Sequence, residues 1–163
     1  MCRRLQAVLA VLTVALAAIS APHRLDAAEQ HVTTSLAHEF GPVDVITSAG
    51  DHILLTGEIH VLTHATILED GTAYFALHAN LIQADGTGNS GTVYHATGAA
   101  FAELVVLDGA PSFPISWDPD FRLQPVGPSS QPSDTIRVNL NLTFSAAQPG
   151  RLAEVDLSAI WVP

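Results

Sequence analysis

Apolar and polar residues alternate along most of the chain, which is the pattern of β-strands with one buried face. The alternation is clearest in Thr56–Ile82, which reads TGEIHVLTHATILEDGTAYFALHANLI. Two alternating runs are separated there by Asp70-Gly71, a dipeptide that favours tight turns. Because side chains on a strand alternate between its two faces, this stretch predicts a β-hairpin with one apolar and one polar face.

The length of the turn decides the register of this hairpin. A two-residue loop at Asp70-Gly71 would pair His64 with Leu77 and mix the two faces, which would bury polar side chains. A three-residue loop with Gly71 in the left-handed conformation keeps the faces apart. It pairs Leu68 with Thr72, His64 with Ala76, Leu62 with His78, and His60 with Asn80. The apolar face then holds Ile59, Val61, Ala65, Ile67, Phe75, Leu77, Ala79 and Leu81.

Further strands are predicted on both sides of the hairpin, bounded by Gly, Pro, Asn, Asp and Ser. They are His31–Phe40, Val43–Thr47, His52–Leu68, Thr92–Leu107, a short strand at Phe121–Gln124, Thr135–Ser145 and Leu152–Val162. Gly57 and Gly98 fall inside long runs and predict a bulge or kink. Asp85–Gly91 is predicted to be a flexible loop, and Asp108–Pro132, with six prolines, to be mostly irregular.

Seven to eight consecutive strands predict an all-β fold with antiparallel pairing. The length suits a single domain over residues 29–163, with one core. A single antiparallel β-barrel and a two-layer sandwich both fit the strand count. The barrel is favoured, since long strands with internal glycines are how sheets coil and close.

The first 28 residues have the composition of a secretory signal peptide. Arg3 and Arg4 precede a short apolar run, Leu5–Ala21, that ends among small residues. Cleavage is expected after Ser20 or after Ala28. An uncleaved membrane anchor is the alternative for this leader, and no later run is apolar and long enough to span a bilayer. The mature chain is therefore expected to be secreted or periplasmic, with no membrane span.

The mature chain is strongly acidic. Cleavage at either site leaves four arginines against sixteen carboxylates or three against fifteen, a formal charge of −12, and the sequence has no lysine. This charge makes nucleic acid and anionic membranes poor partners, so no nucleic-acid partner is expected, whereas cations are plausible partners. The one cysteine, Cys2, belongs to the leader, so the mature chain has no disulfide or thiol chemistry.

Several short motifs resemble a group of small secreted bacterial β-rich proteins of uncharacterised function. They are Gly57–Val61 with His64, His78-Ala79-Asn80, Thr92–Gly98, and Phe121-Arg122-Leu123 before a long penultimate strand. The likeness covers about two-thirds of the chain. It implies secretion and an all-β fold, and it implies no activity.

Histidines on the polar face are the most distinctive candidate functional residues. His60 and His64 share a face, but four residues of strand separate them by about 13 Å, so they cannot bind one ion directly. In the predicted register His78 lies diagonal to both. A ligand-binding surface is predicted from Glu58, His60, His64, His78, Asn80 and His95, with His95 joining if its strand places it beside Asn80. Glu58, His60 and His78 would suit zinc or copper.

Three functions remain open at this stage. The first is a secreted, non-enzymatic domain that binds an extracellular ligand or partner. The second is a small enzyme that uses the face with Glu58, His60 and His78 for acid–base chemistry. The third is an extracytoplasmic metal-binding protein, for which a divalent cation would be the cofactor. Asp85, Thr87 and Asn89 have the spacing of a calcium loop, but the glycine and glutamate that such a loop needs are absent.

Overall fold

The computed structural model describes residues 29–107, 114–128 and 130–163. The predicted signal peptide, residues 1–28, lies outside this part of the chain. Eight strands follow one another, namely β1 (Gln30–Ile46), β2 (His52–Ile67), β3 (Ala73–Gly88), β4 (Val93–Val106), β5 (Ile115–Trp117), β6 (Asp120–Pro125), β7 (Asp134–Phe144) and β8 (Leu152–Trp161). No helix in the described residues is long and apolar enough to cross a membrane.

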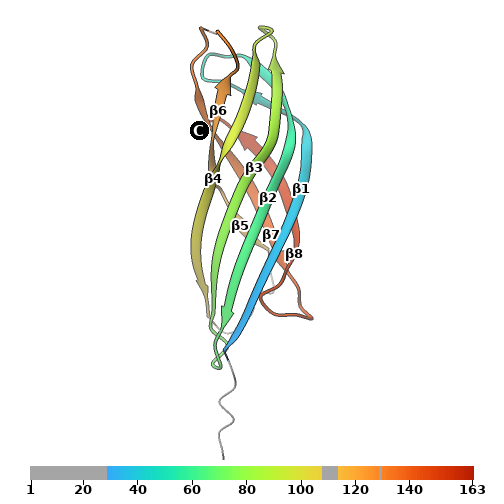
Figure 1. Cartoon of the computed structure of the whole chain (residues 1–163), viewed down its shortest axis with the longest axis vertical. Coiled ribbons are helices and arrows are strands. Elements are labelled where there is room, and N and C mark those ends of the chain that lie inside the picture. Colours follow the sequence, from blue (N-terminus) through green and yellow to red (C-terminus); the bar gives the residue numbers. More distant parts are fainter. Residues whose placement is uncertain (1–28, 108–113, 129) are drawn as a thin grey trace, which may run out of the picture.

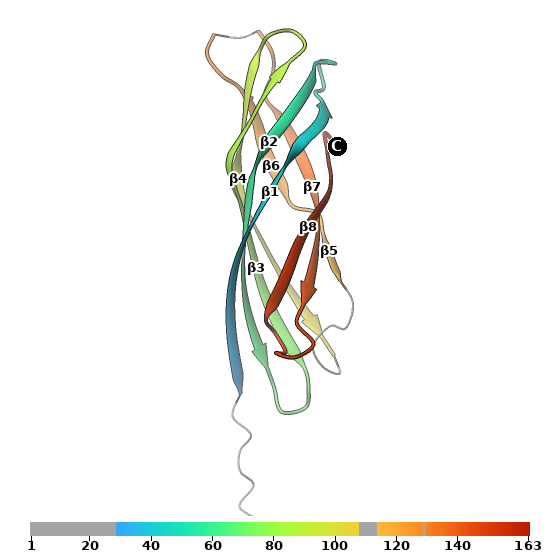
Figure 2. The same cartoon turned by 90° about the vertical axis from the view of Figure 1, so that its right-hand side faces the viewer.

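All eight strands belong to one antiparallel sheet. The order is β1-β2-β3-β4-β6-β7-β5, and β8 also pairs with β7. The sheet is long and narrow and curls strongly around its own axis into a half-barrel (Figures 1 and 2). The prediction of an all-β antiparallel fold with seven to eight strands is confirmed, and the strands form one curled sheet instead of the two sheets of a sandwich.

The central hairpin has the register that its turn predicts. His60 pairs with Asn80, Leu62 with His78 and His64 with Ala76. The Leu68 amide donates to the Thr72 carbonyl at 2.8 Å, and Gly71 has a φ of 85°. The three-residue turn with a left-handed glycine is therefore confirmed, and with it the separation of the two faces.

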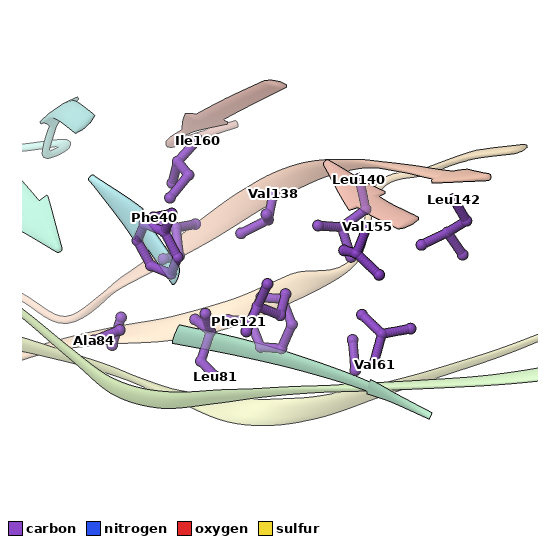
Figure 3. Close-up of a cluster of buried hydrophobic side chains, with 14 of the residues drawn as sticks. Phe40, Val61, Leu81, Ala84, Phe121, Val138, Leu140, Leu142, Val155 and Ile160 are labelled. Carbon is purple, nitrogen blue, oxygen red and sulfur yellow. The ribbon is translucent and has the colours of Figure 1, made fainter. Parts of the chain in front are cut away.

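The concave side of the sheet is the hydrophobic core. Side chains from β2 and β3 point toward those from β7 and β8 across the interior (Figure 3). In β7, which lies within the predicted strand Thr135–Ser145, the alternate residues Val138, Leu140 and Leu142 are fully buried. Since the interior is filled with apolar side chains, the polar face of the central hairpin meets solvent on the convex side.

Two predicted strands, His31–Phe40 and Val43–Thr47, are in fact one. β1 continues through Gly41-Pro42 because both halves pair with β2, and only the register shifts between Phe40 and Val43. A matching irregularity lies at Gly57, where a Cβ atom would come within 2.6 Å of Ala84 Cα. The predicted bulge at Gly57 is thus confirmed, and it is a point of close backbone approach where the sheet coils.

The predicted flexible loop at Asp85–Gly91 is wrong. β3 runs to Gly88, which still pairs with Ile53 of β2. Only a short turn therefore joins β3 to β4, and the Gly88 amide closes it by donating to the Thr92 carbonyl at 2.8 Å. Gly88 leaves room for the Asp51 carboxylate, which a Cβ atom at this position would overlap. Gly86 and Gly88 therefore serve packing, and the calcium spacing lies mostly on extended strand instead of a loop.

The segment predicted to be irregular contains two short strands. The predicted strand at Phe121–Gln124 is confirmed as β6, which is one residue longer at each end. β5 was not predicted, because three residues are too few to show alternation. Both strands pair with the same edge of β7, one after the other.

Candidate ligand-binding surface

The convex surface of β1–β4 carries the predicted polar face in a regular array of four strands by four positions. Strand pairing places one residue of each strand side by side in every row. We call this surface the histidine face. Its rows are His31-Thr66-Tyr74-Val105, Thr33-His64-Ala76-Glu103, Ser35-Leu62-His78-Phe101 and Ala37-His60-Asn80-Ala99. Glu103 is the one carboxylate among these sixteen positions.

Each of the four imidazoles on this face has one specific neighbour. Three are joined to hydroxyl groups across the β1–β2 ladder: His31 Nδ1 to Thr66 Oγ1 at 3.1 Å, His64 Nδ1 to Thr33 Oγ1 at 2.9 Å, and His60 Nε2 to Ser35 Oγ at 2.6 Å. These bonds use one ring nitrogen and leave the other available to a ligand. The fourth ring, His78, packs edge-on against Phe101 with ring centroids 4.7 Å apart.

Five of the six predicted site residues lie on this convex surface of the central hairpin. His60, His64, His78 and Asn80 belong to the array, and Glu58 extends the same face two residues beyond His60. His78 is diagonal to both His60 and His64, as the register predicts. His64 and His78 are exposed, and the others are half-buried.

His95 does not join this group. The prediction placed it beside Asn80, but Asn80 pairs with Ala99 and His95 pairs with Asp85, five residues further along β3. The short turn after Gly88 fixes this register, which the prediction missed because it treated the turn as a flexible loop. His95 Nδ1 instead lies 2.6 Å from Asp85 Oδ1 in an exposed hydrogen-bonded pair.

The proposed metal ligands are neighbours but do not converge. His60 uses Nε2 in its bond to Ser35, and His78 is turned edge-on to Phe101. In the part of the chain that the structure describes, no group of three or more His, Cys, Asp or Glu side chains could hold a metal ion. Zinc or copper binding by Glu58, His60 and His78 stays a prediction.

A depression in the histidine face lies over Ala76. Its small side chain sits between His64 on β2 and Glu103 on β4, and the Tyr74 ring rises beside it on β3. This groove has a volume of about 400 Å³ and is lined by His64, Thr66, Tyr74, Ala76, Glu103 and Val105, with backbone beneath. A larger groove of about 520 Å³ lies between β1 and the turn before β8, and none of the predicted site residues lines it.

A second polar cluster, at the end of the half-barrel where β1 turns into β2, is built differently. Asp51 is 7% exposed as a residue. Its carboxylate accepts hydrogen bonds from the Ser90 amide at 3.0 Å, the Ser90 hydroxyl at 2.5 Å and the Tyr94 hydroxyl at 3.1 Å. The Ser90 hydroxyl is the main reason that the pKa of Asp51 lies below its usual value. Burial raises the pKa of Tyr94, and the bond to Asp51 adds to this rise.

This Asp51 cluster joins two turns to β4, which indicates a structural role. Thr47 Oγ1 accepts from the Asp51 amide at 2.9 Å, and the Ser48 amide donates to Asp134 Oδ2 at 3.1 Å. The turns that follow β1 and β3 are thereby held to each other and to the start of β7. All the carboxylate bonds are made within the protein, so this buried acid needs no ligand.

Much of the histidine face comes from strands outside the central hairpin and was not predicted from the sequence. Tyr74 and Ala76 alternate with His78 in the central hairpin, but Phe101, Glu103 and the hydroxyls of β1 lie on neighbouring strands. The signal that would have placed them is the register of the two flanking hairpins, which their short turns fix.

No protein-family model, no curated protein and no solved structure matches this chain.

Proposed function

We propose that the protein is a secreted, non-enzymatic domain that binds an extracellular ligand or partner through the histidine face. The observation that carries the proposal is the gathering of exposed recognition groups on one convex surface, while the concave side is filled by the core. Recognition groups exposed on a rigid sheet need little reorganisation to bind, which lowers the entropic cost of association.

The aromatic side chains support a binding role. Phe101 is 54% exposed and Tyr74 47%, although large aromatic rings usually contribute to a core. Both belong to the same surface as the four imidazoles, and both stand on paired strands. Exposed aromatic residues next to hydrogen-bonding groups are typical of the centres of binding surfaces.

The arrangement favours binding over acid–base chemistry. A catalytic acid or base works best in a pocket that excludes water and adjusts its pKa. Glu58, His60 and His78 lie on an open surface, and each is exposed or half-buried. This open arrangement supports binding more than acid–base chemistry.

Backbone chemical-shift mapping by NMR tests the proposal. The isotopically labelled mature chain is titrated with a library of soluble oligosaccharides, short peptides and free amino acids. We expect the amides of His64, Ala76, His78 and Phe101 to shift with at least one ligand. Phe101→Ser should abolish that binding, whereas the matched control Val93→Ser, on another exposed part of β4, should leave it unchanged.

Two results would contradict this function. One is a ligand whose shifts gather elsewhere, such as the groove between β1 and the turn before β8. The other is turnover of a library member at a rate that depends on His60 or His78, which would establish an enzyme.

A further inference from the structure

We propose that the groove over Ala76 is a subsite for one pyranose ring of an uncharged carbohydrate. This inference rests on the proposed function and names the ligand class for the same surface. It is carried by three features of the groove, namely its shape, the chemistry of its lining and the charge around it.

The shape follows from one small residue among larger ones. Ala76 lies in a row between His64 and Glu103, and Tyr74 and His78 are its neighbours on the same face of β3. The groove of about 400 Å³ falls in the size range of small-molecule sites. Because its floor is sheet backbone, the depression is preformed and does not depend on a mobile loop.

The lining combines an apolar platform with hydrogen-bonding groups, which is what a sugar ring requires. The exposed Tyr74 ring can pack against the C–H face of a pyranose, with Val105 beside it. Glu103 offers acceptor oxygens to sugar hydroxyls, and charge-assisted bonds of this kind are the strong ones. His64 is oriented through Nδ1 by Thr33, so its Nε2 is left for the ligand.

Charge selects an uncharged ligand. The mature chain carries −12, and the groove itself contains Glu103, so anionic sugars and phosphates are repelled. Glu103 is the only carboxylate among the residues that line the groove. Most polar positions of the surrounding face are imidazole, hydroxyl or amide groups, which suit a ligand rich in hydroxyls better than a cation.

The experiment uses calorimetry with neutral gluco-, manno-, galacto- and xylo-oligosaccharides of four to six sugars. Ala76→Leu fills the groove at a half-buried position on the outer face of β3, where a larger side chain can extend toward solvent. Ala37→Leu makes the same change on β1, outside the groove, as the matched control. We expect at least one oligosaccharide to bind, with Ala76→Leu weakening it roughly tenfold or more and Ala37→Leu less than about twofold.

The variant Glu103→Gln distinguishes an uncharged sugar from a cationic ligand. For a sugar, the affinity should fall while remaining nearly independent of salt, because the ligand carries no charge. The inference is overturned if no oligosaccharide of the panel binds at millimolar concentration, or if Ala76→Leu binds as well as the unchanged protein. It is also overturned if a lysine-rich peptide occupies the groove with an affinity that salt and Glu103→Gln both remove. The proposed function survives these failures when shift mapping finds another ligand on the histidine face.

Discussion

The Asp51 cluster and the histidine face use the same kinds of side chain for opposite purposes. Asp51 is buried, and Ser90 and Tyr94 direct their donors at it from two sides. The histidines of the face are exposed or half-buried, and none has more than one side-chain partner among the contacts that the described residues make. Polar groups that are satisfied within the protein hold the fold together, whereas groups with spare hydrogen-bonding capacity are available to a ligand.

The largest effect is expected in the hydrophobic core, which underlies the sheet. Leu140→Ala should lower the free energy of unfolding by about 2–5 kcal/mol, because the Leu140 side chain is fully buried on the inner face of β7 and its truncation leaves a cavity. Urea denaturation measures the loss. Asn141→Ala, at the neighbouring half-buried position on the outer side of β7, is the control and should cost much less. Equal costs would show that the two faces of β7 are assigned the wrong way round.

Asp51→Asn should have the next largest effect. The change keeps the shape but removes the charge that the Ser90 hydroxyl, the Ser90 amide and Tyr94 stabilise, so the melting temperature should fall. Asp85→Asn, which breaks only the exposed pair with His95, is the matched control and should have a small effect. If the two variants have the same melting temperature, the Asp51 cluster does not stabilise the turns.

The contribution of Asp51 to the free energy of unfolding should also depend on pH. Its pKa in the folded protein lies below the usual 3.8, so its stabilisation is complete above that value and is lost as the pH falls through the folded pKa. The difference in stability between the unchanged protein and Asp51→Asn should therefore be constant from pH 7 to about pH 5 and shrink below pH 3.8. A difference that instead grows on acidification would contradict the stated cause of the shift.

A smaller effect, of opposite sign, is expected at Thr63. Its Oγ1 is buried and has no hydrogen-bond partner among the described residues, which is costly in an apolar core. Thr63→Val keeps the shape and should raise the free energy of unfolding by about 1 kcal/mol. The control Thr33→Val, on the histidine face, should leave stability nearly unchanged while it removes the bond to His64. Destabilisation by Thr63→Val would mean that its hydroxyl has a partner in solution.

Zinc should give the smallest effect. Glu58, His60 and His78 are not arranged as three converging ligands. Zinc at concentrations up to about 1 mM should therefore shift the melting temperature very little. Differential scanning calorimetry measures the shift. A clear rise that His78→Ala abolishes would instead establish the metal site.

The fold could be predicted from sequence largely because one turn was read correctly. Asp70-Gly71 with its flanking alternation fixes which residues of Thr56–Ile82 face the core, and the filled concave side follows from it. The same reasoning failed at Asp85–Gly91, where glycines look flexible in sequence. There the backbone packs against Asp51, a contact between residues that are nearly forty positions apart.

The candidate site was predictable only within a single hairpin. His60, His64, His78 and Asn80 come from two strands joined by a short turn, so their arrangement is local in sequence. Phe101 and Glu103 enter the face through the pairing of β3 with β4, and that register depends on the turn that was misread. The position of His95 was wrong for the same reason. Long-range pairing, and not side-chain chemistry, was the missing information.

One paired measurement tests the division between the two regions most directly. Asp51→Asn and Tyr74→Ser are each measured for their free energy of unfolding and for the affinity of the tightest ligand found by shift mapping. The account predicts that Asp51→Asn lowers stability and leaves the affinity of the folded protein unchanged. Tyr74→Ser should change stability by less than about 1 kcal/mol, since exposed positions contribute little, and should remove most of the affinity. Unchanged affinity in Tyr74→Ser, or lost affinity in a folded Asp51→Asn, would contradict it.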